Sequence, residues 1–148
     1  HLEWLTTDRD ENLAGIAAWI AEAQLPNLHG PVRLDVNDPD WLVSEARYAF
    51  SANTAHIMSW PEVGQMFAGV AKVLLREGSF CLYGPFNRDG EFTSESNRTF
   101  DAMLRRRDPE MGIRDDRAMI ELGEGNGLTL AADHAMPANN RLLVWARG

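Results

Sequence analysis

The chain has 148 residues, 45% of them hydrophobic, which is enough apolar material for one core and predicts a single domain over residues 1–148. Its formal net charge of -8 excludes bulk nucleic acid and an anionic membrane as main partners, because both are bound by clustered Lys and Arg. The lone Cys81 excludes an intramolecular disulfide, and no signal peptide or bilayer-length apolar run occurs, so we expect a cytoplasmic protein.

Strands and helices are expected to alternate along the chain. Apolar runs predict strands at residues 2–7, 32–36, 48–52, 79–83, 128–136 and 141–145. Apolar residues at helical spacing predict four helices. We expect Asp10, Ser59 and Asp115 to cap three of them, Ser59 in a capping box with Glu62, and the fourth to begin near Ser94. They are expected to end at Pro26-Asn27, at Glu77-Gly78, near Arg107 and in the Gly-rich residues 123–127. Trp41 opens a further short segment that we read as a helical turn.

The connections between the expected strands predict the sheet. Repeated strand-helix-strand units indicate a mostly parallel α/β sheet with helices on both faces. The last two strands are joined only by residues 137–140, too short for a helical crossover, so the chain should end in an antiparallel hairpin.

Polar side chains follow four consecutive predicted strands. Ligands of parallel sheets bind beyond the carboxyl ends of the strands, so we expect these residues to gather at one edge. They are Asp8, Asp35, Asn53 with His56, and Tyr83 with Asn87.

Each of these residues also has a purely structural interpretation. Asp8 and Asp35 are of the type that caps helices and forms turns, and Asn53 is a common turn residue. His56, beside Ile57 and Met58, would then be a half-buried imidazole with satisfied hydrogen bonds, and residues 105–107 an exposed helix face.

Several stretches carry a resemblance to a known family. They are Phe50-Ser51-Ala52-Asn53 with His56-Ile57-Met58, Lys72-Val73-Leu74-Leu75-Arg76-Glu77-Gly78, Leu82-Tyr83-Gly84-Pro85-Phe86, Ser96-Asn97 with Phe100-Asp101 and Leu104-Arg105, Arg107-Asp108-Pro109 with Gly112-Ile113-Arg114-Asp115, and Met136-Pro137-Ala138-Asn139-Asn140. The chain resembles class I S-adenosylmethionine-dependent methyltransferases. Within that class it resembles the uncharacterised domain-of-unknown-function family 938, related to animal methyltransferase-like protein 26. The resemblance implies a Rossmann-like sheet, S-adenosylmethionine as cofactor and a small-molecule methyl acceptor.

The resemblance also implies roles for individual residues. Asp8 stands where the class binds the cofactor's ribose, since a carboxylate accepts two hydroxyl hydrogen bonds at once. Asp35 stands where the class binds the adenine amino group, with the Val36 amide available for a ring nitrogen. Asn53 falls where many members face the methyl acceptor. The residues after it are Thr54-Ala55-His56, which does not support the class that methylates DNA bases or glutamine.

One part of the class pattern is absent from the sequence. The class has a first strand followed by a Gly-rich loop that approaches the cofactor's methionine part. No Gly-x-Gly follows a strand here, and Gly123, Gly125 and Gly127 follow a helix. We therefore expect an N-terminal segment before His1, or another chain, to supply the central strand, and we expect the chain by itself to be inactive.

The acceptor side of the expected site rests on further residues. His56 is the candidate general base, because an imidazole takes up a proton near neutral pH, and Asn53 would orient the acceptor. Tyr83, Asn87 and the polar segment after Pro85 would wall the acceptor pocket. Arg107 or Arg114 would grip an anionic acceptor group, or else pair with Asp101, Asp115 or Asp116.

Two other functions are compatible with the sequence. A nicotinamide-dependent dehydrogenase would share the acid after its second strand, although the closing hairpin counts against it. A catalytically inert interaction module would keep the fold without binding the cofactor. The four histidines show no metal-ligand spacing, so we expect no metal site. A homodimer is left open beside the monomer.

Overall fold

The computed structural model describes residues 2–43 and 45–148. The chain forms two compact units, one before Glu45 and one spanning Glu45–Gly148. We call them the N-terminal and C-terminal units and describe each by itself. The expectation of a single domain over residues 1–148 remains a prediction.

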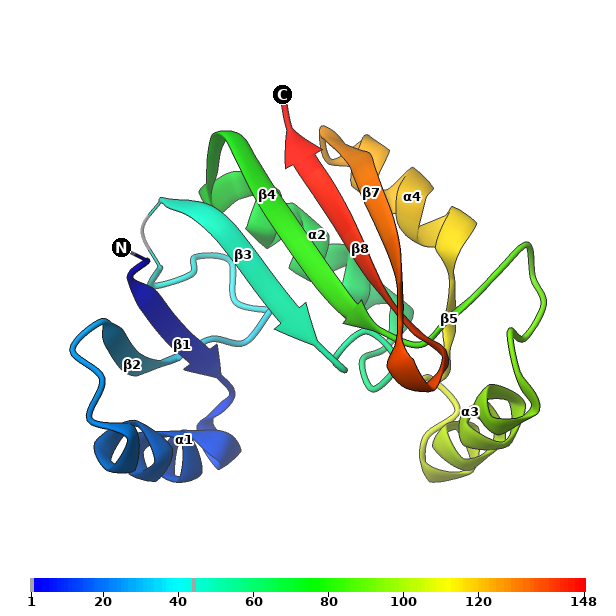
Figure 1. The fold of residues 1–148 in the computed structure, drawn as a ribbon, viewed down its shortest axis with the longest axis horizontal. Helices are drawn as coiled ribbons and strands as arrows, with labels where there is room; N and C mark the ends of the chain where they lie inside the picture. Colours follow the sequence, from blue (N-terminus) through cyan, green and yellow to red (C-terminus); the bar gives the residue numbers. More distant parts are fainter. Residues whose placement is uncertain (1, 44) are drawn as a thin grey trace. The chain divides into compact units, whose positions relative to one another are not determined.

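The N-terminal unit is one strand-helix-strand unit. β1 (Trp4–Asp8) and β2 (Leu28–Arg33) pair in parallel, and α1 (Asp10–Ala23) connects them (Figure 1). None of residues 2–43 that the structure describes is fully buried, because two strands and one helix have too little area to enclose a core.

Three local predictions in this unit were wrong. Asp10 does not cap α1: the capping position is Arg9, without a side-chain hydrogen bond, and Asp10 instead pairs with Arg33 at 2.9 Å. The second strand ends at Arg33, earlier than the predicted Val36, because residues 34–38 fold into a turn. Residues 41–43 form no helical turn.

The C-terminal unit is built on a four-stranded sheet. Its strand order is β3 (Ala46–Ala52), β4 (Leu74–Gly84), β8 (Asn140–Arg147) and β7 (Leu128–Met136), as Figure 1 shows. β3 and β4 are parallel, whereas β8 is antiparallel to both of its neighbours. The short helical turn η1 (Pro137–Asn139) joins β7 to β8. The predicted α/β fold with a closing antiparallel hairpin is thus confirmed.

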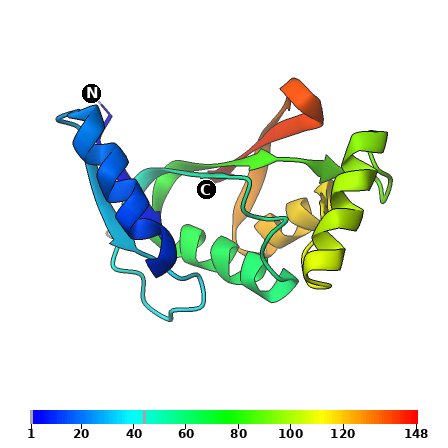
Figure 2. The ribbon, with the colours of Figure 1, turned by 90° about the horizontal axis from the view of Figure 1, so that it is seen from below.

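The helices of this unit lie on one face of the sheet and at one end of it. α2 (Trp60–Val73) and α4 (Asp116–Gly125) cover the same face, while α3 (Glu95–Arg107) lies beyond one end (Figure 2). The minimal strands β5 (Phe86–Asn87) and β6 (Arg114–Asp115) pair in parallel and connect these parts. No helix of the described residues is long and apolar enough to span a bilayer.

Local sequence signals explain where α2 begins but not where it ends. The predicted capping box is confirmed: the Ser59 amide donates to Glu62 Oε2 at 2.7 Å, and the Glu62 amide to Ser59 Oγ at 3.4 Å. The predicted end at Glu77-Gly78 is wrong, because the apolar residues from Leu74 onward enter β4 directly.

Three aromatic rings form the centre of the core. Phe67 from α2 meets the rings of Phe80 and Trp145 edge-on, with centroids 5.3 and 5.0 Å apart. Phe80 and Trp145, from neighbouring strands, stack at 5.7 Å. Gly123 of α4 approaches so closely that a Cβ there would lie 2.5 Å from Trp145 Nε1, so this position requires glycine. This packing holds the helices against β4 and β8 and so places the segments described next.

Candidate functional site

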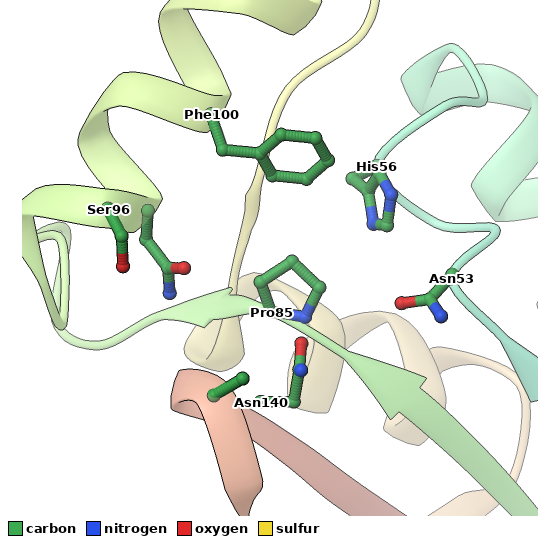
Figure 3. Close-up of a pocket in the computed structure, with 8 residues that line it drawn as sticks. Asn53, His56, Pro85, Ser96, Phe100 and Asn140 are labelled. Atoms are coloured by element: carbon green, nitrogen blue, oxygen red, sulfur yellow. The ribbon is translucent and has the colours of Figure 1, made fainter.

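A pocket of about 520 Å³ opens in the C-terminal unit at the carboxyl end of β3 and β4. It lies between the loop after β3, the end of β4, the first turns of α3 and the hairpin turn (Figure 3). Its volume falls within the range of small-molecule sites. The residues that line it are Asn53, His56, Pro85, Ser96, Asn97, Phe100, Ala138 and Asn140.

Asn53 turns the chain at the end of β3. Its φ of 58° is left-handed, a conformation that Asn tolerates better than most residues. Its amide donates to the Tyr83 carbonyl at 2.8 Å, which ties the turn to the end of β4. The side chain is thereby directed into the pocket (Figure 3).

His56 is buried at the pocket wall, with 6% of its surface exposed. Phe100 of α3 meets the imidazole edge-on, with centroids 5.2 Å apart (Figure 3). No described residue forms a hydrogen bond with its ring nitrogens, and neither nitrogen is among the buried unpartnered atoms of the described residues, so both keep exposed surface. Burial, and then the nearby charge of Arg114, lower the pKa of His56 below its ordinary value. The imidazole is therefore neutral at pH 7 and can accept a proton.

Arg114 holds the loop that carries His56. Its guanidinium donates to the carbonyls of Ala55 at 3.1 Å and Glu110 at 2.8 Å, and also to that of Met58. It also lies over the Trp60 ring, 5.9 Å from the centroid. Arg114 thus binds backbone carbonyls, and neither an acid partner nor a ligand is needed to explain its position.

Asp101 anchors this arrangement from α3. It is 6% exposed, and its two oxygens accept from the Ile113 amide and from Arg105 Nε, each at 2.8 Å. The neighbouring Gly112 amide donates to the His56 carbonyl at 2.9 Å. Gly112 has a φ of 153°, which L side chains rarely adopt, and a Cβ there would lie 2.9 Å from Asp101 Oδ1, so this position favours glycine. The backbone of His56 is therefore fixed on both sides by residues 112–114.

We expect Arg114→Gln to loosen the loop and to raise the pKa of His56. The loss of a guanidinium that serves three carbonyls should cost roughly 2–4 kcal/mol of stability. Removing the positive charge should move the pKa of His56 upward, although burial keeps it below the ordinary value. Arg114→Lys keeps the charge but lacks the fork, so it should destabilise the loop and leave this pKa in place. NMR titration of His56 and amide exchange at Gly112 measure the two effects; equal pKa values in both variants would contradict the electrostatic part.

The hairpin turn is pinned to the start of α3. Asn97, 5% exposed, donates from its side chain to the Asn139 carbonyl at 3.3 Å and to Thr93 Oγ1 at 3.1 Å. Ala138 and Asn139 both adopt left-handed φ angles, of 57° and 58°, which forms the tight turn between β7 and β8. Ala138 and Asn140 are thereby presented to the pocket.

The other residues predicted for the acceptor side lie elsewhere. Of the residues described, Tyr83, Asn87, Arg107 and Arg114 do not line this pocket. Tyr83 is within the sheet, opposite Ala52 and Leu142. Asn87 pairs with Asp115 through β5 and β6, and its side-chain oxygen is buried without a hydrogen bond in the described part of the chain. Arg107 is exposed at the end of α3. Their roles as acceptor contacts stay predictions.

In the N-terminal unit, Asp8 and Asp35 lie at the carboxyl ends of two adjacent parallel strands. The Leu34 amide donates to the Asp8 carbonyl at 2.8 Å, so the chain after β2 still follows the end of β1. Asp8 Oδ1 accepts from the Arg9 amide at 2.7 Å and from Asn12 Nδ2 at 2.9 Å. Asp35 Oδ1 accepts from the Asn37 amide at 2.9 Å, with Val36 between them in the turn. Both acids therefore form the local loop and turn hydrogen bonds that their structural interpretation predicts.

The second carboxylate oxygen keeps open a ligand role for each acid. Within the described residues, Asp8 Oδ2 takes no hydrogen bond, and Asp35 Oδ2 has only a 4.0 Å contact with Arg9 Nε. Free carboxylate oxygens at neighbouring strand ends fit the hydroxyl and amino donors of a nucleoside. Among the residues described, no three of His, Cys, Asp and Glu lie together as metal ligands.

Sequence reasoning found part of the pocket. It selected Asn53 and His56 from their position after a strand, but it missed Ser96, Asn97, Phe100 and Asn140 as pocket residues. All of these belong to the stretches that carried the family resemblance, which was the available signal. These residues line one pocket because α3 and the hairpin turn pack at the same end of the sheet. No local sequence pattern specifies that packing.

The fold defines the class of protein. A parallel β-α-β arrangement with a closing antiparallel hairpin and a pocket at the carboxyl end of the strands is the Rossmann-like fold of class I methyltransferases. The chain belongs to the family described as a protein of unknown function, DUF938, whose model matches residues 1–147.

Solved structures support the same fold. An O-methyltransferase family protein from Burkholderia thailandensis matches with a TM-score of 0.84 at 12% identity, over 96% of this chain and 42% of that one. The mitomycin 7-O-methyltransferase MmcR matches with a TM-score of 0.81 at 12% identity, over 96% of this chain and 41% of that one. LepI, solved in complex with SAM, matches with a TM-score of 0.77 at 15% identity, over 99% and 36%. The chain thus spans less than half the length of these proteins.

Proposed function

We propose that this chain is part of an S-adenosylmethionine-dependent methyltransferase that acts on a small molecule. The observation that carries the proposal is His56: a buried, neutral imidazole with accessible ring nitrogens, in a pocket at the carboxyl end of the strands of a methyltransferase-like fold. This is where open α/β sheets bind their ligands and where a proton acceptor is useful.

The cofactor side of the proposal rests on the N-terminal unit. S-adenosylmethionine, when bound, supplies an electrophilic methyl group on a positively charged sulfur. Asp8 accepts hydrogen bonds from the ribose hydroxyls through its open oxygen, while Asn12 holds the other oxygen in place. Asp35 accepts from the adenine amino group, and the Val36 amide serves a ring nitrogen. Asn53, at the end of β3 in the C-terminal unit, is also proposed to contact the cofactor.

The acceptor side rests on the pocket of the C-terminal unit. His56 accepts the proton that an acceptor hydroxyl loses as its oxygen takes the methyl group. Asn53 orients that hydroxyl, and residues 112–114 keep the imidazole from moving away from it. Most of the rate enhancement then comes from holding the two reactants in line. Tyr83 in β4 and Asn87 in β5 lie on either side of the lining residue Pro85 in the chain.

Several finer statements belong to the same proposal. We propose a cytoplasmic protein, without bulk nucleic acid or a membrane as partner, related to a methyltransferase-like protein of animals. The two other functions, an inert binding module and an NAD-dependent dehydrogenase, predict different ligands, and no observation in the structure favours either.

Calorimetric titration of the intact protein with S-adenosylmethionine tests the proposal. We expect saturable binding that Asp8→Asn weakens by about 10- to 100-fold, because a hydrogen bond to a carboxylate contributes roughly 1.5–3 kcal/mol. Asp10→Asn is the matched control: it removes the same charge two residues away, from an exposed side chain paired with Arg33, and should leave the affinity unchanged.

Two results would overturn the proposal. No binding by the unaltered protein at millimolar cofactor would favour the inert module, and tight binding of NADH would favour the dehydrogenase. Thermal melting of each variant by circular dichroism separates a lost contact from a lost fold.

A further inference from the structure

The pocket of the C-terminal unit has a mostly apolar surface with several hydrogen-bonding groups, and it carries no charge among its described lining residues. Its hydrogen-bonding groups are the side-chain amides of Asn53, Asn97 and Asn140, the Ser96 hydroxyl and the neutral imidazole of His56. The remaining lining residues are Pro85, Phe100 and Ala138. Amides and hydroxyls bind neutral donors and acceptors well, but they do not neutralise a buried charge.

The arginines around His56 and those next to lining residues in the chain have other partners. Arg98 pairs with Glu95, and Arg141 pairs with Asp133. The Arg114 guanidinium serves three backbone carbonyls, and Arg105 donates to Asp101 at 2.8 Å. Arg107 is exposed and lies outside the pocket lining. An anionic ligand in the pocket would therefore lack a cationic partner.

A cationic ligand would also lack a partner. The nearest buried carboxylate is that of Asp101, and both of its oxygens are occupied, by the Ile113 amide and by Arg105. The charge of Arg114 acts on the lining residue His56, and the same charge opposes an ammonium group there. Neither sign of charge is favoured inside.

His56 supplies a specific contact for a neutral ligand. It is more than nine-tenths buried, yet no described residue hydrogen-bonds to its ring nitrogens. Neither nitrogen is among the buried unpartnered atoms of the described residues, so both keep exposed surface, and the unprotonated one can accept a hydrogen bond from a ligand. Phe100 beside it offers an aromatic edge to an apolar ring (Figure 3).

Resting on the function proposed above, we infer that the methyl acceptor is an uncharged hydroxylated small molecule with an aromatic body. Its hydroxyl donates to His56, its ring packs on Phe100 and Pro85, and its other polar groups meet Asn53, Asn140 and Ser96. Carboxylates, phosphates and ammonium groups are excluded.

Three probes of equal size test this inference on the intact protein without cofactor. They are 4-hydroxybenzamide, which is neutral, 4-hydroxybenzoate, which is anionic, and 4-hydroxybenzylamine, which is cationic. NMR of the His56 imidazole signal follows their binding. We expect the neutral probe to shift this signal saturably and to bind at least tenfold more tightly than either charged probe. Equal or tighter binding of a charged probe, or no shift by any probe at millimolar concentration, would overturn the inference.

A variant pair strengthens the test. Ser96→Lys places a cation at the pocket and should raise the ratio of 4-hydroxybenzoate affinity to neutral-probe affinity at least tenfold. Ala102→Lys adds the same charge on the exposed part of α3, outside the pocket lining, and should change neither affinity. If both variants raise the benzoate affinity equally, the pocket is not where the probe binds.

The probe experiment and the cofactor titration fail independently. Binding of the neutral probe without any binding of S-adenosylmethionine would overturn the proposed function and leave standing only the preference of the pocket for neutral hydroxylated ligands. Cofactor binding together with preference for the anionic probe would do the reverse.

Discussion

If the proposed function holds, His56→Gln is expected to slow methyl transfer by about 10²- to 10⁴-fold, the usual contribution of a general base. Gln retains a polar group of similar size and can still accept a hydrogen bond, but it cannot take up the proton that the acceptor releases. The ring contact with Phe100 is lost, but the backbone bonds from residues 112–114 do not involve the imidazole, so the loop should keep its place. Single-turnover kinetics with the neutral acceptor measures the effect directly.

His134→Gln provides the matched control for this variant. His134 lies in β7 and is exposed, outside the described lining of the pocket, so its replacement should leave the rate unchanged. A His56→Gln enzyme as fast as the unaltered one would mean that the acceptor loses its proton without this residue.

The pH dependence of His56 follows from its lowered pKa. Because burial, and then Arg114, hold the folded-state pKa below the unfolded value of about 6.5, the base stays deprotonated and the rate should fall only below pH 6.5. The free energy of unfolding should fall in the same direction of pH as the rate. The unfolded chain binds more protons between the two pKa values, so stability is full above pH 6.5 and declines as the pH falls through that window. The His56→Gln variant should lack this decline, as denaturation at several pH values would show.

Phe67→Ala is expected to destabilise the C-terminal unit by about 3–5 kcal/mol, as for other buried Phe residues. Phe67 has no exposed surface and meets both Phe80 and Trp145, so its loss removes two of the three ring contacts of the core. Native-state hydrogen exchange at β4 and β8 amides measures the stability of the C-terminal unit separately from that of the N-terminal unit. Exchange there should accelerate by about a hundredfold or more.

Met103→Ala is the control for Phe67→Ala. Met103 is 51% exposed on α3, and its truncation should change stability by less than about 0.5 kcal/mol. If Phe67→Ala were equally mild, the three rings would not be the centre of this core.

The sequence by itself determined the type and order of most elements. Periodicity placed α2 and α3, Ser59 and Asp115 were recognised as helix caps, and the four-residue connection at 137–140 specified the antiparallel hairpin. These features depend on contacts within a few residues, so a local pattern contains enough information to predict them. The boundaries that failed, at Val36 and Glu77, fall where an apolar run suits more than one conformation.

Only the tertiary structure decided the composition of the pocket and the task of Arg114. A guanidinium in a sequence suits an anion, an acid or a row of carbonyls equally well. In the structure, Arg114 of β6 donates to backbone carbonyls of the loop after β3 and of the segment after α3. It thereby fixes the backbone around His56. In the same way Phe100 and Asn140, 40 positions apart in number, became neighbours of His56 because α3 and the hairpin turn dock at the same end of the sheet. Such long-range packing is set by the shapes of whole elements, which the local order of residues does not contain.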